Sequence, residues 1–233
     1  MKLIIANWKL NPSTLKEAQE LASSVPKKSK NKVVLCPPTI FLSQIKYPFL
    51  GAQDCFWEEK GPYTGQTSVL QLRSLGVKYC LIGHSENRAL GETDKQINAK
   101  IRVLIRHKIE PVLCVGFGTK KNDSLSVIKK ILLSQIKKAM GGIGKRRLVI
   151  AYEPVWAISR GLGTGRPADP AHAAEIAGFI RSKIANAAVL YGGSLDAKNA
   201  RGFAARKIIA GGLVGGVSLR PAEFLKIVEA FNN

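Results

Sequence analysis

Acidic residues, cysteine and long apolar runs are all scarce in this chain. The apolar run nearest the N-terminus, Leu3 to Ala6, is too short for a signal peptide. No uninterrupted apolar stretch in the 233 residues approaches the roughly 18 that span a membrane. We therefore expect a soluble protein of the cytoplasm that is neither secreted nor inserted in a membrane.

The four cysteines, Cys36, Cys55, Cys80 and Cys114, are widely separated, and three of them lie in apolar runs. The sequence contains no Cys-x-x-Cys pair and no Cys/His spacing of a metal site. This pattern excludes the disulfide framework of a small secreted domain and indicates buried free thiols in a reducing compartment. It predicts no metal site.

The scarcity of acids leaves a large positive charge, because 36 Lys and Arg face 16 Asp and Glu, a net +20. Such a charge is typical of nucleic-acid binding or of attraction of an anionic substrate, but solvated lysines on helix faces and loops also produce it. Aromatic residues do not alternate with the basic clusters, as they do where single-stranded bases stack. We favour solvated lysines with incidental attraction of anions, and expect no nucleic-acid partner. The clusters are Lys27 to Lys32, Lys120 with Lys121, Lys129 with Lys130, Lys137 with Lys138, and Lys145 to Arg147.

Short apolar runs alternate with longer amphipathic segments along the whole chain. The runs predict eight strands: Lys2–Asn7, Lys32–Cys36, Phe49–Gln53, Lys78–Gly83, Glu110–Val115, Arg147–Tyr152, Ala188–Tyr191 and Gly211–Val214. The amphipathic segments predict helices at Thr14–Ser24, Thr39–Tyr47, Ser68–Leu75, Asn87–His107, Ser124–Met140, Pro170–Ile184, Ala197–Ala205 and Arg220–Phe231. Helix-start signals support two of them, a capping box of Thr14 with Glu17 and an Asp169-Pro170 pair.

Strand–helix alternation with short connections implies parallel strands, and eight such units close into a (β/α)₈ barrel. We predict one α/β domain over residues 1–233, with eight parallel strands inside and helices outside. An open doubly wound sheet is the alternative. No Gly-x-Gly-x-x-Gly motif follows the first predicted strand, which argues against a dinucleotide-binding sheet.

In such barrels the active site lies at the carboxyl ends of the strands, so polar residues there are the candidates. Glu153 follows the sixth predicted strand where the apolar run ends at Pro154, and Gly161, Gly163 and Gly165 come soon after. An acid beside a glycine-rich loop is suited to act as a general base under a lid. A surface glutamate before a turn proline is the plainer alternative.

The first and fourth predicted strands end in further candidates. Asn7 and Lys9 are two residues apart and share a face, so both point into the barrel mouth, although a rim lysine is the alternative. His84 precedes Ser85 and Glu86 at the start of a predicted long helix. The N-terminal dipole of that helix favours a neutral imidazole. Glu86 either pairs with Lys9 or interacts with the helix N-terminus.

Glycines end the last two predicted strands. Gly192 and Gly193 precede Ser194 after the seventh strand, and Gly215 and Gly216 follow the eighth. Backbone amides approach an anion closely where side chains are absent, and the loops after these two strands form the usual phosphate site of the fold. A paired glycine alone is weak evidence, since tight turns use it too.

The chain resembles the triosephosphate isomerase family from end to end. Five segments carry the resemblance in order: Asn7 to Asn11, Gly83 to Arg88, Ala151 to Ile158, Tyr191 to Ser194 and Leu213 to Gly216. The resemblance implies a TIM barrel of glycolysis and gluconeogenesis with a small phosphorylated triose as substrate. The implied reaction interconverts dihydroxyacetone phosphate and D-glyceraldehyde 3-phosphate by proton transfer through an enediolate, with no cofactor and no metal.

The resemblance also implies catalytic roles. Glu153 is expected as the base that moves a proton between adjacent carbons. Neutral His84 is expected to polarise the carbonyl and to carry protons between the two oxygens. Lys9 is expected to stabilise the enediolate oxygen, with Asn7 as a further polar contact.

The same resemblance implies a phosphate site and a lid. Ser194 and the amides of Gly215 and Gly216 are expected to hold the phosphate, together with a lid amide that we place at Gly163. The lid would be Pro154 to Gly165, which closes over the phosphate and excludes water. Trp156 would anchor its first hinge.

A homodimer is also implied. The family projects the loop corresponding to Gly61–Gly65 into the neighbouring subunit, with Thr64 at its tip near the partner's catalytic residues. An ordinary surface loop rich in turn residues is the alternative.

The chain departs from the family at three places. Ser159 to Leu162 lengthen the lid by about four residues, by comparison with the family pattern. Phe117 stands where a glutamate commonly helps to hold the open lid, and Gln66 stands where the interface loop commonly carries a glutamate. We expect an active enzyme with changed lid kinetics or a weaker dimer.

Two alternatives to the isomerase stay open on sequence alone. One is another phosphate-binding barrel, such as a phosphoribosyl isomerase, against which the combination of His84, Glu153 and Lys9 argues. The other is a basic, nucleic-acid-binding or otherwise non-catalytic barrel whose altered lid no longer works.

Overall fold

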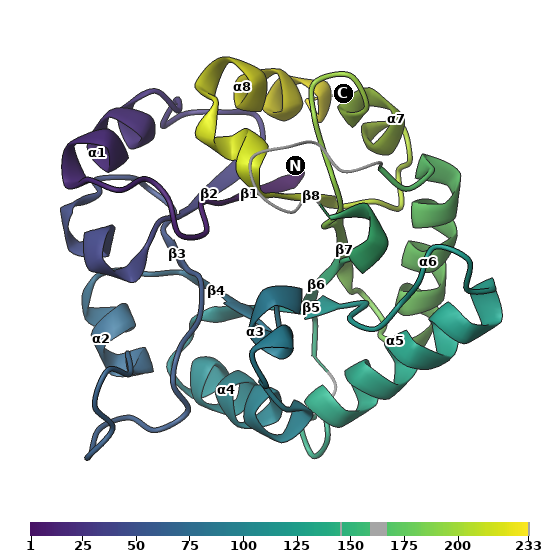
Figure 1. Ribbon diagram of the computed structural model, residues 1–233, viewed down its shortest axis with the longest axis horizontal. Coiled ribbons are helices and arrows are strands. Elements are labelled where there is room, and N and C mark those ends of the chain that lie inside the picture. The colour runs from purple at the N-terminus through teal and green to yellow at the C-terminus, as the bar shows by residue number, and fades with distance from the viewer. Residues whose placement is uncertain (145, 159–166, 233) are drawn as a thin grey trace.

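Eight parallel strands form the centre of the molecule, and the helices surround them (Figure 1). The computed structural model describes residues 1–144, 146–158 and 167–232. The strands are β1 (Leu3–Asn7), β2 (Lys32–Cys36), β3 (Gly51–Ala52), β4 (Tyr79–Ile82), β5 (Glu110–Val115), β6 (Val149–Tyr152), β7 (Ala188–Tyr191) and β8 (Gly211–Val214).

The strands close into a barrel. They neighbour one another in the order β2-β1-β8-β7-β6-β5-β4-β3. A bridge between Leu35 and Leu50 joins the two ends of this order, and the Leu35 N–H donates to the Phe49 carbonyl at 3.1 Å. The expected (β/α)₈ TIM barrel is therefore confirmed.

The helices begin at capping signals that the sequence carries. Thr14 and Glu17 form the predicted capping box, and Asp169 caps the helix that opens with Pro170. Within the described ranges, no helix combines the length and the apolar character needed to cross a membrane. The helices are α1 (Leu15–Ser23), α2 (Val69–Ser74), α3 (Ser85–Ala89), α4 (Asp94–Arg106), α5 (Leu125–Ala139), α6 (Pro170–Lys183), α7 (Ala200–Ala204) and α8 (Pro221–Ala230), with 3₁₀ turns η1 (Thr39–Gln44), η2 (Val155–Ala157) and η3 (Gly216–Leu219).

Alternation along the strands divides the core into two layers. Side chains that point inward fill the barrel, and those that point outward pack against the helices. All four cysteines are buried and free, as predicted. The inner layer comprises Ile5, Val34, Cys36, Leu81, Val112, Cys114, Val149, Ala151, Leu190 and Leu213.

The prediction of one continuous helix over Asn87–His107 is wrong. The chain forms the short α3, breaks, and starts again as α4. Gly91 lies in the break with φ +101°, a conformation that interrupts a right-handed helix. Thr93 then makes a capping box with Gln96, which starts a new helix at Asp94.

The part of the chain between β2 and β4 also differs from the sequence expectation. The segment predicted as a helix from Thr39 forms the 3₁₀ turn η1, and β3 is reduced to the pair Gly51–Ala52. Pro48 and Gly51 break up this part of the chain, so little of it can pair regularly.

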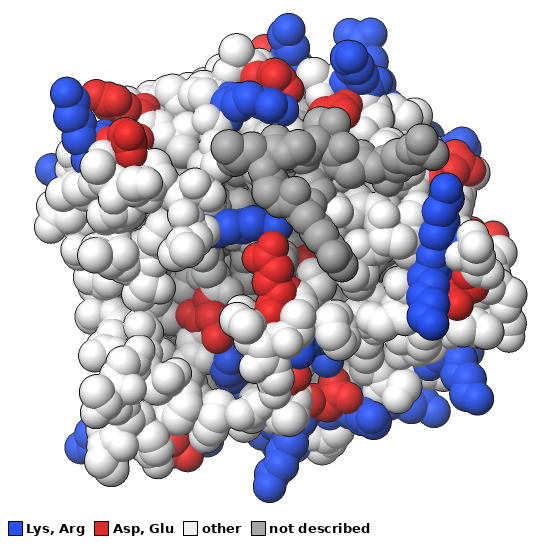
Figure 2. Space-filling model, in the orientation of Figure 1, with Lys and Arg blue, Asp and Glu red and all other residues white. Residues whose placement is uncertain are grey.

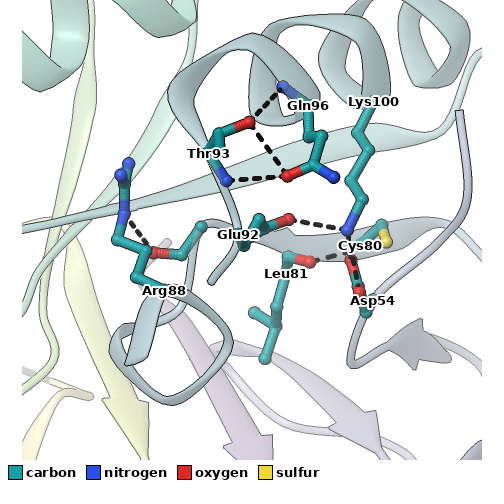
Figure 3. Close-up of polar contacts among 9 residues, drawn as sticks. Asp54, Cys80, Leu81, Arg88, Glu92, Thr93, Gln96 and Lys100 are labelled. Atoms are coloured by element: carbon teal, nitrogen blue, oxygen red, sulfur yellow. Dashed lines mark hydrogen bonds and ion pairs between the residues drawn. The ribbon is translucent and has the colours of Figure 1, made fainter. Parts of the chain in front are cut away.

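A buried ion cluster fastens the break between α3 and α4 to the barrel (Figure 3). The Lys100 ammonium donates to Asp54 Oδ1 at 2.7 Å and to Glu92 Oε1 at 2.6 Å. The side chains of Lys100 and Glu92 are each 7% exposed. Burial raises the pKa of Glu92, although Lys100 partly offsets this effect. Burial lowers the pKa of Lys100, but the two carboxylates outweigh it, so the net shift is upward.

Replacing Lys100 by methionine should destabilise the fold at pH 7 by about 3–5 kcal/mol, because Glu92 is left as a buried, unpaired charge. The loss relative to the unmodified protein should shrink as the pH falls towards 5. Without Lys100 the pKa of Glu92 rises further above its unfolded value, and a raised pKa favours the folded state as the carboxylate takes up its proton. Urea unfolding at several pH values measures both effects.

The matched control is Lys129→Met, which removes the cation of the more exposed Lys129–Glu175 pair. This substitution should lower the free energy of unfolding by less than about 1 kcal/mol at every pH. Equal losses in the two variants would contradict the assignment of a buried cluster.

Candidate active site

Most of the polar residues predicted from the strand ends surround one hollow at the carboxyl end of the barrel. Figure 2 views the molecule from this end, where basic and acidic side chains meet at the barrel mouth. Gly163 and the inserted Ser159–Leu162 lie outside the described residues. The predicted residues that line the hollow are Asn7, Lys9, His84, Glu153, Ser194, Gly215 and Gly216.

Glu153 directly follows β6 and is almost completely buried. Its N–H donates to the Val115 carbonyl at 2.8 Å, and its Oε2 accepts the Ser85 N–H at 2.9 Å. Its Oε1 accepts no hydrogen bond from the described residues. A buried oxygen without a donor is costly, so the carboxylate is held by one oxygen while the other faces the hollow unsatisfied.

Because Gly116 has no side chain, the backbone of Glu153 can lie against the end of β5. Its φ is +123°, and a Cβ at this position would overlap the Glu153 carbonyl. Gln135 of α5 braces the same turn, because its side chain accepts the Gly116 N–H and donates to the Phe117 carbonyl. The position of Glu153 therefore depends on the backbone of the neighbouring strand.

His84 lies between Glu153 and the first turn of α3. Its Nδ1 accepts the Glu86 N–H at 3.2 Å, so Nδ1 carries no proton and the proton of a neutral ring is on Nε2. Nε2 lies 3.1 Å from Glu153 Oε1, a close contact without the alignment of a hydrogen bond. The amide that fixes this tautomer belongs to a helix of one turn rather than to the long helix that was predicted.

Lys9 reaches the hollow from an unusual backbone conformation. Its φ is +54°, and its N–H donates to Asn7 Oδ1 at 3.0 Å while its carbonyl accepts from Gln53 Nε2 at 2.8 Å. The ammonium pairs with Glu86 Oε1 at 2.6 Å. A Cβ on Gly215 would lie 3.3 Å from Lys9 Cε, so this glycine makes room for the lysine. Both roles considered for Glu86 are present, because it pairs with Lys9 and also lies in the first turn of α3.

The opposite wall of the hollow carries the predicted anion site. The amides of Gly215 and Gly216 donate no hydrogen bond to the described part of the chain. The Ser194 N–H donates to the Ala157 carbonyl at 2.8 Å, which ties the end of β7 to η2. Two unused backbone amides beside an ammonium are suited to bind an anionic oxygen.

Trp156, the predicted hinge residue, packs beside the hollow rather than lining it. Its ring meets the His172 ring edge-on at 6.3 Å, and His172 Nε2 lies 3.2 Å from Tyr152 Oη. Burial lowers the pKa of His172, although Glu175 and Asp169 oppose the shift. The Trp156 Nε1 is buried and has no hydrogen-bond partner among the described residues.

Thr64 is exposed and does not line the described hollow of its own chain. It lies in the loop between β3 and α2, which extends away from the barrel at the lower left of Figure 1. Within this loop Phe56 packs on Tyr63, and the Gln66 N–H donates to the Tyr63 carbonyl at 3.1 Å.

Several residues that position the site carry no local signal in the sequence. Gln53, Gln135 and the Ser85 amide act on groups that are distant along the chain. Arg88 is a fourth, because its Nε donates to the Gly83 carbonyl at 2.9 Å just before His84. For Arg88, the sequence contains one indication of a role at the site, because Arg88 ends the Gly83–Arg88 segment that carries part of the family resemblance.

A parallel (β/α)₈ barrel with an acid, an imidazole and an ammonium at the carboxyl ends of its strands has the arrangement of a barrel enzyme. The family model described as triosephosphate isomerase matches residues 2–231. The chain belongs to the triosephosphate isomerase family, and this makes it an isomerase.

Proteins named triosephosphate isomerase match nearly the whole chain. One from Thermoanaerobacter sp. (strain X514) is 40% identical and spans 97% of this chain and 98% of its own length. One from Aquifex aeolicus (strain VF5) is 38% identical over 99% of both chains. One from Caldanaerobacter subterraneus subsp. tengcongensis is 37% identical over 97% of this chain and 98% of its own. Nothing in these similarities favours a non-catalytic barrel.

Gly116→Ala should lower isomerase activity by about 100-fold, because the new Cβ displaces Glu153 and small misplacements of catalytic groups are costly. Gly118→Ala is the matched control. Gly118 also has a positive φ, +87°, but no described atom lies within 4 Å of its Cβ position. Both variants should lose about 1–3 kcal/mol of stability from backbone strain, while Gly118→Ala keeps its activity. Equal kcat values, measured in the same assay, would refute the dependence on Gly116.

Proposed function

We propose that this protein interconverts dihydroxyacetone phosphate and D-glyceraldehyde 3-phosphate, with Glu153, His84 and Lys9 as its catalytic residues and with no cofactor. The observation that carries the proposal is the 3.1 Å contact between His84 Nε2 and Glu153 Oε1, an oxygen that accepts no hydrogen bond from the described residues. A proton acceptor and a proton donor thus meet at one point of the hollow. This is the pair of groups that proton abstraction beside a carbonyl requires.

The first step moves a proton from carbon to Glu153. The carboxylate leaves the Ser85 N–H and takes a proton from the carbon next to the substrate carbonyl. The electron pair of that C–H bond forms a carbon–carbon double bond, and the carbonyl electrons move to the oxygen to give an enediolate. Returning the proton to the neighbouring carbon, with transfer of a hydroxyl proton between the oxygens, completes the isomerisation.

His84 and Lys9 act on the oxygens. The Nε2 proton of His84 polarises the carbonyl and passes between the two oxygens, because the Glu86 amide keeps the ring in this tautomer. Lys9 supplies the positive charge for the enediolate once its ammonium turns from Glu86 to the substrate. Asn7 adds a polar contact and also holds the Lys9 backbone.

The phosphate is assigned to the far wall of the hollow. The amides of Gly215 and Gly216 and the hydroxyl of Ser194 are the proposed hydrogen-bond donors to the phosphate. A phosphate bound there would orient the substrate with its reacting carbons next to Glu153. The four buried, free cysteines fit a reducing cytoplasm, where we place the protein.

Glu153→Gln should reduce kcat by about 10²- to 10⁴-fold, since the amide cannot take the proton, while KM changes little. A coupled assay with glyceraldehyde 3-phosphate measures both constants. Glu223→Gln, which removes an acid that does not line the hollow, should leave them unchanged. A Glu153→Gln enzyme with normal kcat would refute the assignment of the base.

We further propose that two copies of this chain form a homodimer through the Gly61–Gly65 loop. Leu10 and Leu90 support it, because they are 93% and 89% exposed beside Lys9 and α3. Ile40, 78% exposed, follows β2 in the same half of the barrel as that loop. Exposed apolar side chains grouped beside a projecting loop are typical of a surface that another protein covers.

Thr64→Arg should weaken this dimer by roughly tenfold or more, because a charged side chain enters a packed interface. Activity at low enzyme concentration should fall with it. Sedimentation velocity measures the association, and Ser182→Arg on the exposed side of α6 serves as the control. Identical association in the two variants would contradict an interface at this loop.

A further inference from the structure

Two of the five basic clusters, the one at Lys27 to Lys32 and the one that contains Arg146 and Arg147, lie at the end of the barrel opposite the candidate active site. Because all strands are parallel, the segments that lead into them lie at one end and the segments that leave them at the other. We call the described residues of the first set the strand-entry face, comprising residues 1–2, 24–32, 45–50, 75–78, 107–110, 140–144, 146–148, 184–187 and 205–210.

The strand-entry face is strongly charged with one sign. Its described residues include 12 lysines and arginines and one acid, Glu110, which gives a net +11 of the chain's +20. The described segments that leave the strands carry no such excess, with seven basic and nine acidic residues. This second set is 8–14, 37–38, 53–68, 83–93, 116–124, 153–158, 167–169, 192–199 and 215–220. A general basic composition would not divide the charge in this way.

Six of these cations converge on two adjoining hollows. A hollow of about 450 Å³ is lined by Lys32, Lys78, Lys108 and Arg146, and one of about 230 Å³ by Lys2, Lys32 and Arg147. Both hollows share Lys32, Tyr79 and Glu110. The register of the strands produces the convergence, since the Lys32 N–H donates to the Lys2 carbonyl and the Glu110 N–H to that of Lys78.

These cations have no acidic partners. Among the residues that the structure describes, none of the six makes an ion pair within 4 Å. Glu110 is the nearest acid, half-buried beside Arg146, Arg147 and Lys32, and burial raises its pKa against their opposing influence. Arg146 Nε is buried without a hydrogen-bond partner in the described part of the chain. Unpaired cations that crowd together repel one another unless an anion joins them.

The sequence alone led us to expect no nucleic-acid partner, but the placement of these cations points the other way. We propose that the strand-entry face binds the phosphate backbone of nucleic acid, without reading its sequence. Two hollows side by side with six cations, none of which makes an ion pair among the described residues, fit a ligand whose negative charges are spaced along a chain. Lysine and arginine contacts to phosphates need no base recognition, because counterion release supplies the affinity. This site is independent of the isomerase chemistry, which lies at the other end of the barrel.

A lipid surface fits the face less well. Proteins that lie on anionic membranes insert large apolar side chains among their basic residues. Within the described residues of the strand-entry face, only Met1 and Leu75 expose a large apolar side chain. Phe49 is covered by the Lys32 ammonium, 5.1 Å above its ring, and is unavailable for insertion.

The test measures binding of a fluorescein-labelled RNA of about 30 nucleotides by anisotropy at several KCl concentrations. The unmodified protein should bind with a log–log salt slope of about −4, since six contacts to a single strand contribute about 0.7 each. The variant K32Q/K78Q/K108Q/R146Q should lose about 30-fold or more in affinity at about 100 mM KCl, and its slope should fall towards about −1.5.

The control variant K95Q/K120Q/K121Q/K198Q removes the same charge from positions outside the strand-entry face. It should bind RNA within about threefold of the unmodified protein, because its phosphate contacts are intact. Isomerase activity should be unchanged in both variants, which shows that each is folded.

Three outcomes would overturn the proposal. Equal losses in the two variants would show that binding follows net charge rather than this face. Absence of salt-sensitive RNA binding by the unmodified protein would remove the site altogether. Tighter, face-dependent binding to phosphatidylserine-containing vesicles than to RNA would assign the surface to membranes instead.

Discussion

The parallel direction of the eight strands is the constraint on which the rest of the molecule depends. It brings residues from β1, β4, β6, β7 and β8 to one end of the barrel, although Asn7 and Gly216 are separated by almost the whole sequence. It also brings the connections rich in lysine and arginine to the other end. The proposed catalytic groups and the cations of the strand-entry face are thereby kept apart by a closely packed core.

At the end of the barrel with the candidate active site, Glu153 and Lys9 each make a contact that the proposed reaction replaces by a contact with substrate. Glu153 accepts a hydrogen bond from the Ser85 amide, and Lys9 pairs with Glu86. His84 is different, since the amide on its Nδ1 remains in place and keeps the tautomer through the reaction. Glycine at position 116 allows β5 and the end of β6 to approach closely enough for these contacts to form.

Much of this could be predicted from the sequence, because apolar periodicity marks strands and the fold places active sites at their ends. The bounds of β2, β5, β7 and β8 were predicted to the residue. The break between α3 and α4 was missed, since an amphipathic pattern runs across Gly91 and only the Thr93 capping box opposes it. Contacts such as Gln53 with Lys9, and the gathering of distant lysines on one face, depend on closure of the barrel and leave no local pattern.

The central claim is that Glu153 moves a proton at carbon. Its most direct test is proton NMR of dihydroxyacetone phosphate incubated in D₂O with the enzyme. A base that exchanges its proton with solvent before returning it puts deuterium on the carbon next to the carbonyl. The account predicts incorporation by the unmodified enzyme and almost none by Glu153→Gln. Incorporation at the same rate by both would contradict it.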